Sequence, residues 1–405
     1  MKSAGVAILS AALLIPLAAA DSASAQPTDA LKVAGSWPAA GYNAAMSNRN
    51  PDETALTSAT VRNLVRKRGI TLPPDSTSQC GFYIEPGPIL VGTTLFTMLG
   101  SNVAAINVTN GQRKWLKPAV DADAPLWYSS LTVVHGRVYV GARDCVSVSD
   151  PNGALFAFNA TTGAPLWSQH RIASIAAMVV TGGKIITSGI NSGEPGSLNA
   201  YDAGTGVHTW INSACAPDPL IVVGQAIIAQ CPTDGSSPAQ LQALSLADGH
   251  VLWRKYGNWR QLRGDTDAAT ATAVFARSPA GWVTLLDPAT GVTTWTSAQR
   301  GTLLAVGKSR VYVTCAGRTI CALDRNTGGV LWKSAAIGPA APSEAVIAAD
   351  LVYPSPASKP LLASTGQSVS MYAADYPPGN GFAISSGFVL TSGLVSRVID
   401  VYGLR

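Results

Sequence analysis

The sequence has 405 residues and a net charge of +5, with 13% charged and 47% apolar residues, 39 Gly and 26 Pro. This composition excludes a disordered chain, which would have few apolar residues and many charges. It also argues against a helical protein, because the helix formers Glu and Lys are scarce. Length alone would suggest two or three domains, but all-β propellers of this size are single domains.

The first 25 residues have the pattern of a secretory signal peptide. Lys2 is followed by an uncharged apolar stretch over residues 4–20 and by an A-x-A site that ends at Ala25. Cleavage there would leave Gln26 as the N-terminus and place the protein in the periplasm or outside the cell. A membrane anchor is the alternative, but the stretch is interrupted and falls short of the roughly 20 apolar residues of a span. We therefore expect no membrane span.

A short basic cluster, Arg62, Arg66, Lys67 and Arg68, lies within a segment that resembles an isolated β-strand, residues 59–70. Such a cluster could bind nucleic acid or anionic lipid. We favour a solvated strand edge, because export also argues against a nucleic-acid partner.

An eleven-residue phrase recurs six times and ends each time in a tryptophan, at intervals of 52, 43, 43, 42 and 37 residues. It begins with an apolar pair and Asp, Asn or Ser, continues with Gly and ends with Trp. The six copies are Ala105–Trp115, Ala157–Trp167, Ala200–Trp210, Ala243–Trp253, Leu285–Trp295 and Ala322–Trp332.

Each part of the phrase fits a β-hairpin. The Asp or Asn side chain can bond to its own backbone and start a turn, and the Gly supplies the positive φ that the turn needs. The Trp then falls on the return strand, where its ring can fill the space between neighbouring sheets. Two more short strands precede each hairpin, so each repeat is a four-stranded antiparallel unit of roughly 40 residues, as in a propeller blade.

The blade count follows from the remaining chain. A seventh repeat, residues 345–372, lacks its Trp, and residues 381–404 hold three further strands. A strand from residues 59–70 would complete the last blade and remove exposed sheet edges. We predict an eight-bladed β-propeller over residues 59–405, with seven blades as the alternative, preceded by a lead-in over residues 26–58.

Six cysteines in an exported chain predict disulfides. Cys215 and Cys231 flank one predicted hairpin, and Cys315 and Cys321 flank another. The remaining pair is Cys80 with Cys145, predicted to lie on the same face in adjacent blades. A redox-active pair is the alternative, but the chain has no C-x-x-C motif, and we predict no metal site.

Candidate site residues lie where the last strand of one blade connects to the first of the next, because ligands usually enter a propeller on that face. The segment 257–270 is the longest such connection and the richest in polar groups. Its arginines could hold an acidic ligand, a stacked ring could use Trp259, and Asp265 could act as a base. Ordinary solvated loop residues are the competing interpretation. The candidates are Trp259, Arg260, Arg263, Asp265, Arg300, His170 and Arg171.

The phrase resembles the PQQ (pyrroloquinoline-quinone) repeat, which quinoprotein dehydrogenases share with non-catalytic relatives. The lead-in, with Trp37-Pro38, Gly41-Tyr42-Asn43 and Asn48-Arg49-Asn50, also looks like that of quinoprotein alcohol and polyvinyl-alcohol dehydrogenases. The resemblance implies the fold. The chain has no adjacent cysteine pair, no C-x-x-C-H haem motif and no lipidated cysteine. It therefore matches the functional pattern of neither the dehydrogenases nor the lipoprotein assembly factors.

Three functions remain open. We expect a non-catalytic binding or scaffold protein, a monomer that presents one face to a protein or glycan partner. The alternative is a dehydrogenase of alcohols or sugars that uses PQQ held by Ca²⁺. A lyase or hydrolase would need convergent carboxylates, which the sequence does not locate.

Overall fold

The computed structural model is an all-β protein. It describes residues 1, 36–72, 87–120, 126–144, 152–190, 196–213, 220–231, 239–265, 272–338, 340–355, 359–371, 380–392 and 397–405. Within these ranges the one helical element is a 3-10 turn, η1 (Val61–Asn63), and no helix is long and apolar enough to cross a membrane. The predicted signal peptide falls, apart from Met1, outside the described residues.

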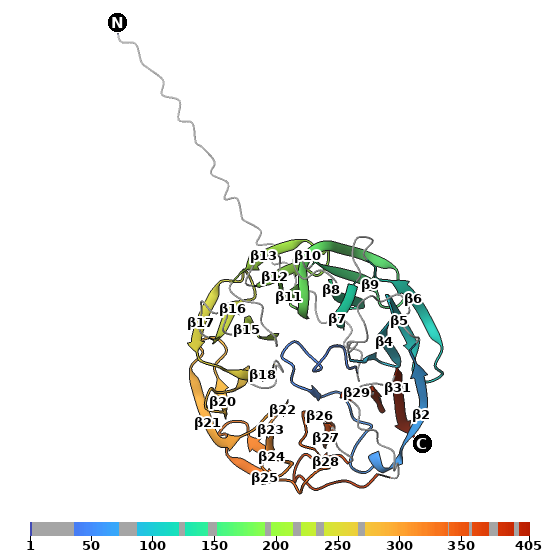
Figure 1. Ribbon diagram of the computed structural model, residues 1–405, viewed down its shortest axis with the longest axis vertical. Coiled ribbons are helices and arrows are strands. Elements are labelled where there is room, and N and C mark those ends of the chain that lie inside the picture. Colours follow the sequence, from blue (N-terminus) through green and yellow to red (C-terminus); the bar gives the residue numbers. More distant parts are fainter. Residues whose placement is uncertain are drawn as a thin grey trace.

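Antiparallel sheets follow one another around a common centre, with the first strand of each near the centre and the last at the perimeter (Figure 1). Four of the sheets contain four consecutive strands each. Their strands are β3 (Ile89–Val91), β4 (Thr94–Leu99), β5 (Asn102–Asn107) and β6 (Arg113–Pro118); β14 (Leu220–Val223), β15 (Ala226–Cys231), β16 (Gln240–Ser245) and β17 (Val251–Tyr256); β18 (Arg260–Asp265), β19 (Ala273–Arg277), β20 (Trp282–Leu286) and β21 (Thr293–Arg300); β22 (Leu303–Val306), β23 (Arg310–Cys315), β24 (Thr319–Asp324) and β25 (Val330–Lys333).

A seven-stranded sheet joins two repeats through one long strand, β10 (Pro165–Thr181). The first half of β10 pairs with β9 as the last strand of one repeat, and the second half pairs with β11 as the first strand of the next. The connection predicted as a loop is therefore continuous strand here. The other strands are β7 (Leu126–Val134), β8 (Arg137–Asp144), β9 (Asn152–Asn159), β11 (Lys184–Ile190), β12 (Ser197–Asp202) and β13 (His208–Asn212).

Two sheets each take a strand from the N-terminal part of the chain. β2 (Leu64–Thr71) pairs with β31 (Val398–Leu404), and β1 (Arg49–Asn50) lies parallel to β26 (Glu344–Ala348). The seventh repeat ends in an isolated bridge between Leu361 and Ser368. The remaining strands are β27 (Leu351–Ser355), β28 (Leu361–Leu362), β29 (Asn380–Ser385) and β30 (Phe388–Ser392). β29 also contacts β3, so the last sheet lies next to the first.

The phrase tryptophans hold consecutive repeats together, as the sequence predicts. A Cβ placed on Gly291 would lie 2.6 Å from the ring of Trp253 in the preceding sheet. Gly291 also has φ +70°, so the glycine provides both the turn and the space for the ring. The Trp253 indole N–H donates to the Pro288 carbonyl at 2.9 Å. The same ring-on-glycine contact recurs in Trp115–Gly163, Trp167–Gly206, Trp210–Gly249, Trp295–Gly328 and Trp332–Gly366.

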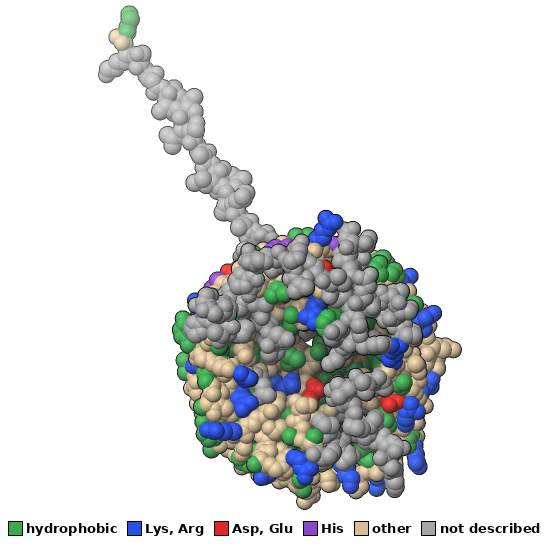
Figure 2. All heavy atoms as spheres, viewed as in Figure 1, with side chains coloured by type: hydrophobic (Ala, Val, Ile, Leu, Met, Phe, Trp, Pro, Cys, Tyr) green, Lys and Arg blue, Asp and Glu red, His purple; other side chains and the backbone are tan. Residues whose placement is uncertain are grey.

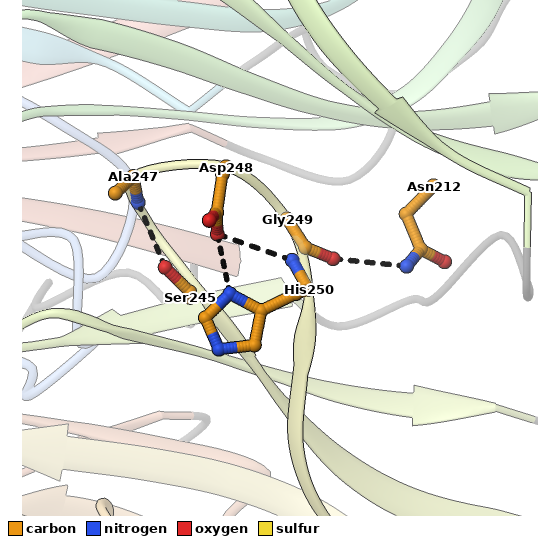
Figure 3. A network of polar contacts seen from close by, with 6 residues as sticks. All are labelled: Asn212, Ser245, Ala247, Asp248, Gly249 and His250. Carbon is orange, nitrogen blue, oxygen red and sulfur yellow. Dashed lines mark hydrogen bonds and ion pairs between the residues drawn. The ribbon is translucent and has the colours of Figure 1, made fainter.

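The turn of the fourth repeat shows how these hairpins are built (Figure 3). Ser245 replaces the usual Asp or Asn, and its hydroxyl accepts a hydrogen bond from the Ala247 N–H at 3.2 Å. Asn212, in the preceding sheet, donates to the Gly249 carbonyl at 2.9 Å. This turn is thus stabilised by its own side chain and by a hydrogen bond from the preceding sheet.

At the junction between the last and first sheets, Arg68 takes the place of a tryptophan. It pairs with Val401 next to a bulge, the register that Trp115 has with Ala105. A Cβ on Gly111 would lie 2.7 Å from the Arg68 guanidinium, which donates to the Thr109 carbonyl. As expected for a strand edge, Arg66 and Lys67 beside it are exposed on β2.

Candidate functional site

The lead-in lines the centre of the ring. Segment 37–50 passes the innermost strands in chain order, and its carbonyls accept hydrogen bonds from their N–H groups. These bonds run from Leu90 to Trp37, Val133 to Pro38, Val222 to Ala44, Gly264 to Ala45, Val306 to Ser47 and Ile347 to Asn48. The Asn50 side chain continues the series by donating to the Ile384 carbonyl at 2.7 Å. Fourteen residues of the chain thus follow the inner wall of the sheets (Figure 1).

Segment 37–50 holds an unusual backbone conformation. Tyr42, Met46 and Asn48 have φ values of 76°, 53° and 53°, in the left-handed region that non-glycine residues rarely adopt. Asn43 stabilises this path, because its side-chain oxygen accepts hydrogen bonds from the Ala45 and Ser47 N–H groups at 3.1 and 3.2 Å. Each such residue costs on the order of 1 kcal/mol or more, so the surrounding contacts must fix this shape.

Arg263, one of the predicted ligand-binding residues, is bound to this segment. Its guanidinium donates to the Met46 carbonyl at 2.8 Å and to the Leu303 carbonyl at 3.3 Å. Burial lowers the pKa of Arg263, and the nearby Glu344 carboxylate opposes this by raising it. Asn48 donates to Glu344 at 3.1 Å and to the Leu304 carbonyl at 3.0 Å. The charged groups at the centre are therefore engaged by the chain's own lead-in.

Asp265, predicted as a possible base, forms a buried ion pair. Its carboxylate lies 2.6 Å from the Arg325 guanidinium, and the two side chains are 4% and 7% exposed. Arg325 also donates to the Gly307 carbonyl at 3.3 Å and lies over the ring of Phe275. The pair thus joins β18 to the turn after β24 in the adjacent sheet. Removing either partner would leave the other as an unpaired buried charge.

Trp259 and Arg260 lie at the start of β18. Trp259 is 7% exposed, its indole N–H donates to the Tyr256 carbonyl at 3.3 Å, and the Lys255 ammonium lies 5.6 Å from its ring. Arg260 is exposed and bonds to the Asn258 side chain at 3.1 Å. The sequence-based expectation that residues 257–270 form a loop is wrong for Arg260–Asp265, which is an innermost strand, because Leu262 and Gly264 pack inward there.

The other candidates lie in two different sheets. His170 and Arg171 lie in the middle of β10, where His170 is exposed, contacts the Ser168 hydroxyl at 3.0 Å and meets Phe156 edge-on. Arg300 ends β21 and covers the ring of Trp282, with its guanidinium carbon 4.3 Å from the ring centroid. Arg300 thus shares a sheet with Arg260, Arg263 and Asp265, whereas His170 and Arg171 lie in another, so the seven candidates do not form one cluster.

One predicted disulfide is present within the described residues. Cys315 and Cys321 are bonded across the β23–β24 hairpin, diagonally rather than face to face, because Cys315 is opposite Thr319. Cys231 is disulfide-bonded as well, and its partner lies outside the described residues. Cys80, Cys145 and Cys215 also fall outside them, so their pairing stays a prediction.

The candidate residues do not fit a bound quinone as they stand. Arg263 donates its hydrogen bonds to backbone carbonyls, Asp265 is paired with Arg325, and the Trp259 ring is buried. Across the part of the chain that the structure describes, no group of three or more His, Cys, Asp or Glu residues could hold a metal ion.

Sequence reasoning missed two features of this centre. Arg325 occupies a variable position of the repeated phrase, so nothing marked it as the partner of Asp265. The central position of segment 37–50 is the second feature, although the Asn and Gly residues of this lead-in indicate turns and positive φ values.

A family model described as outer membrane protein assembly factor BamB matches residues 75–212, 118–255 and 237–375. The chain therefore belongs to this family of PQQ-type repeat proteins.

Quinoprotein dehydrogenases are also similar in sequence. The lanthanide-dependent methanol dehydrogenase of Methylacidiphilum fumariolicum is 25% identical over 164 residues, and the quinohemoprotein alcohol dehydrogenase of Comamonas testosteroni is 29% identical over 153 residues. These regions are 37% and 34% of this chain, but only 26% and 20% of the enzymes. The chain thus matches about a quarter of one enzyme and a fifth of the other.

Solved structures share the fold. The crystal structure of the Comamonas testosteroni enzyme superimposes with a TM-score of 0.64 and 15% identity over 91% of this chain and 80% of that enzyme. BamB from Moraxella catarrhalis superimposes with a TM-score of 0.57 and 16% identity over 84% of this chain and all of BamB. At this identity the likeness concerns the propeller fold alone.

Proposed function

We propose that this chain is a non-catalytic binding protein that acts outside the cytoplasm and presents one face of its propeller to a protein partner. The supporting observation is the path of segment 37–50, which occupies the inner wall and engages Arg263 and Glu344 there. Because the charged groups at the centre bind the protein's own lead-in, the side chains available to a partner lie on the rims of the propeller. The family description, an assembly factor, supports a protein partner.

The proposed ring has eight blades. The described residues form seven sheets, and the seven-stranded sheet counts as two blades because β10 ends one repeat and begins the next. The β2–β31 pairing would complete the last blade and close the ring, and the contact between β29 and β3 supports this.

The alternative is a PQQ-dependent dehydrogenase, which the similarity to two such enzymes favours. Calorimetric titration of PQQ into the purified mature chain, with and without Ca²⁺ or a lanthanide, separates the two functions. We expect no heat of binding, with an apo quinoprotein dehydrogenase as the positive control. Metal-dependent binding at micromolar affinity or better would overturn the binding-protein proposal and call for a dye-linked screen of alcohols and sugars.

Export is tested separately. We expect the mature protein to begin at Gln26, as N-terminal mass spectrometry of the secreted or periplasmic fraction would show. Under non-reducing conditions, peptide mapping should recover Cys80–Cys145 and Cys215–Cys231 as well as Cys315–Cys321. A protein that retains residues 1–25 and stays in the cytoplasm would contradict the proposed location.

A further inference from the structure

Basic side chains gather at one end of the sheet β18–β21. In this sheet β18 begins with Arg260, β19 ends with Arg277 and β21 ends with Arg300. Because neighbouring strands are antiparallel, these three termini lie at the same end of the sheet. Figure 2 shows Lys and Arg side chains over the region where Figure 1 labels β18, β20 and β21. We call Arg260, Arg277 and Arg300 the arginine rim.

The arginine rim carries unneutralised charge. Arg260 and Arg300 are exposed and Arg277 is half-buried, and among the described residues none of the three forms an ion pair with a carboxylate. Arg260 and Arg277 are directly paired across β18 and β19. Like charges opposite each other destabilise a sheet, so the arrangement opposes folding unless an anion covers it.

The arginine side chains are held in place. The Arg300 guanidinium stacks on Trp282, and Arg260 is bonded to Asn258. A Cβ on Gly281, in the turn between β19 and β20, would lie 3.6 Å from an Arg277 guanidinium nitrogen and 3.9 Å from Arg300 Cδ. Two arginines therefore flank the same small turn. Fixed guanidinium groups lose less freedom when they bind a carboxylate in a two-point contact.

The acidic side chains of this sheet lie elsewhere. Asp265 ends β18 at the opposite end and is paired with Arg325. Asp287 follows β20 at that same opposite end, where it accepts hydrogen bonds from Ala289 and Thr290 of its own turn. The sheet is thus polarised, with free cations at one end and engaged carboxylates at the other.

Two aromatic rings beside the arginine rim already contact cations of the protein itself. Arg300 covers one face of Trp282, and Trp259 is buried below Lys255. Sugar rings and nucleic-acid bases bind such sites by stacking on open aromatic faces. Here Trp282 orients Arg300. The exposed ring nearby is Tyr256, at the end of β17. The charged groups of the rim are guanidinium forks, which match planar carboxylates.

We propose that the arginine rim binds an acidic segment of the partner protein. This inference rests on the proposed binding function and names the chemistry that its partner must present. Glu or Asp side chains along an extended segment would neutralise Arg260, Arg277 and Arg300, and would relieve the repulsion between the paired arginines.

The test measures binding of fluorescent hexaglutamate to the mature chain by anisotropy at low and physiological salt. Wild type should bind it, more weakly at higher salt, and should not bind hexaglutamine. The triple variant Arg260→Gln, Arg277→Gln, Arg300→Gln should bind at least tenfold more weakly. The matched control Arg113→Gln, Lys114→Gln, Lys333→Gln removes the same charge from exposed outer strands and should bind like wild type.

Several outcomes would overturn the proposal. Equal losses of hexaglutamate affinity in the two triple variants would mean that net charge alone causes the binding. An unchanged affinity of the rim variant would mean that the arginine rim is not the binding site. Tighter binding of oligogalacturonate or oligo(dT) than of hexaglutamate would replace the acidic protein segment by another polymer. A thermal melt confirms that the rim variant is folded; the loss of repulsion should leave its melting temperature equal or higher. PQQ binding would instead refute the underlying function, independently of these results.

Discussion

Two kinds of side chain fill the glycine sites between consecutive repeats. At six of these sites a phrase tryptophan lies on the glycine of the next repeat, and where the last sheet meets the first, Arg68 lies on Gly111. The six tryptophans are rigid rings against backbone, whereas Arg68 is a flexible cation that reaches the Thr109 carbonyl. Chain connectivity brings the six pairs together. The Arg68 junction joins strands far apart in sequence, where an adaptable side chain tolerates small errors in position.

The largest effect should come from removing a ring. Trp115→Ala deletes a buried side chain and its bond to the Ala160 carbonyl, and should lower the free energy of unfolding by about 3–5 kcal/mol. Arg68→Ala at the other kind of junction should cost about 1 kcal/mol, because a half-exposed side chain loses little burial. Urea denaturation of both variants checks this. Equal losses would mean that the junctions are equivalent.

Glycine substitutions sharpen the comparison. Gly291→Ala and Gly111→Ala share the strain of a positive φ, 70° and 76°. Only the former meets a ring, at 2.6 Å, because Arg68 can swing away from Gly111. We expect Gly291→Ala to cost about 1–2 kcal/mol more than Gly111→Ala. A smaller loss for Gly291→Ala, measured by the same denaturation, would show that the Trp253 ring gives way.

The six tryptophans themselves differ in one hydrogen bond. Among the described residues the buried Trp210 indole N–H has no acceptor, whereas that of Trp253 bonds to Pro288. Phenylalanine keeps a ring and removes the N–H, so Trp253→Phe should cost about 1 kcal/mol more than Trp210→Phe. Paired thermal melts give the difference, and a larger loss for Trp210→Phe would point to a partner for its indole.

The smallest effect concerns pH. A hydrogen bond from the Thr290 hydroxyl and further bonds from its turn lower the pKa of Asp287, and the Thr205 hydroxyl does the same for Asp202. A lowered folded-state pKa gives stability that is present above the ordinary carboxylate pKa and is lost as the pH falls below it. Asn occupies this position in the first two repeats, so Asp287→Asn with Asp202→Asn keeps the turns. The double variant should lose slightly less melting temperature than wild type between pH 6 and about pH 3; an identical loss would contradict the prediction.

The sequence by itself determined the propeller fold, because the phrase needs only local chemistry. The Asp, Asn or Ser turn, the glycine and the tryptophan specify a hairpin within eleven residues, and repetition makes hairpins stack. The Cys315–Cys321 bond was predictable for the same reason, since a short hairpin brings the two side chains together. Of the basic cluster, Arg66 and Lys67 are exposed on the edge strand β2 as predicted, whereas Arg68 is half-buried against Gly111.

Only the tertiary structure decided what lies at the centre and on the rim. The Asp265–Arg325 pair and the bond from Arg263 to the Met46 carbonyl join residues 60 and 217 positions apart. No local pattern records such distant contacts, because they depend on how the sheets pack around segment 37–50. The arginine rim is a similar case: strand direction brings Arg260, Arg277 and Arg300 to one end of a sheet, and spacing along the chain does not show it.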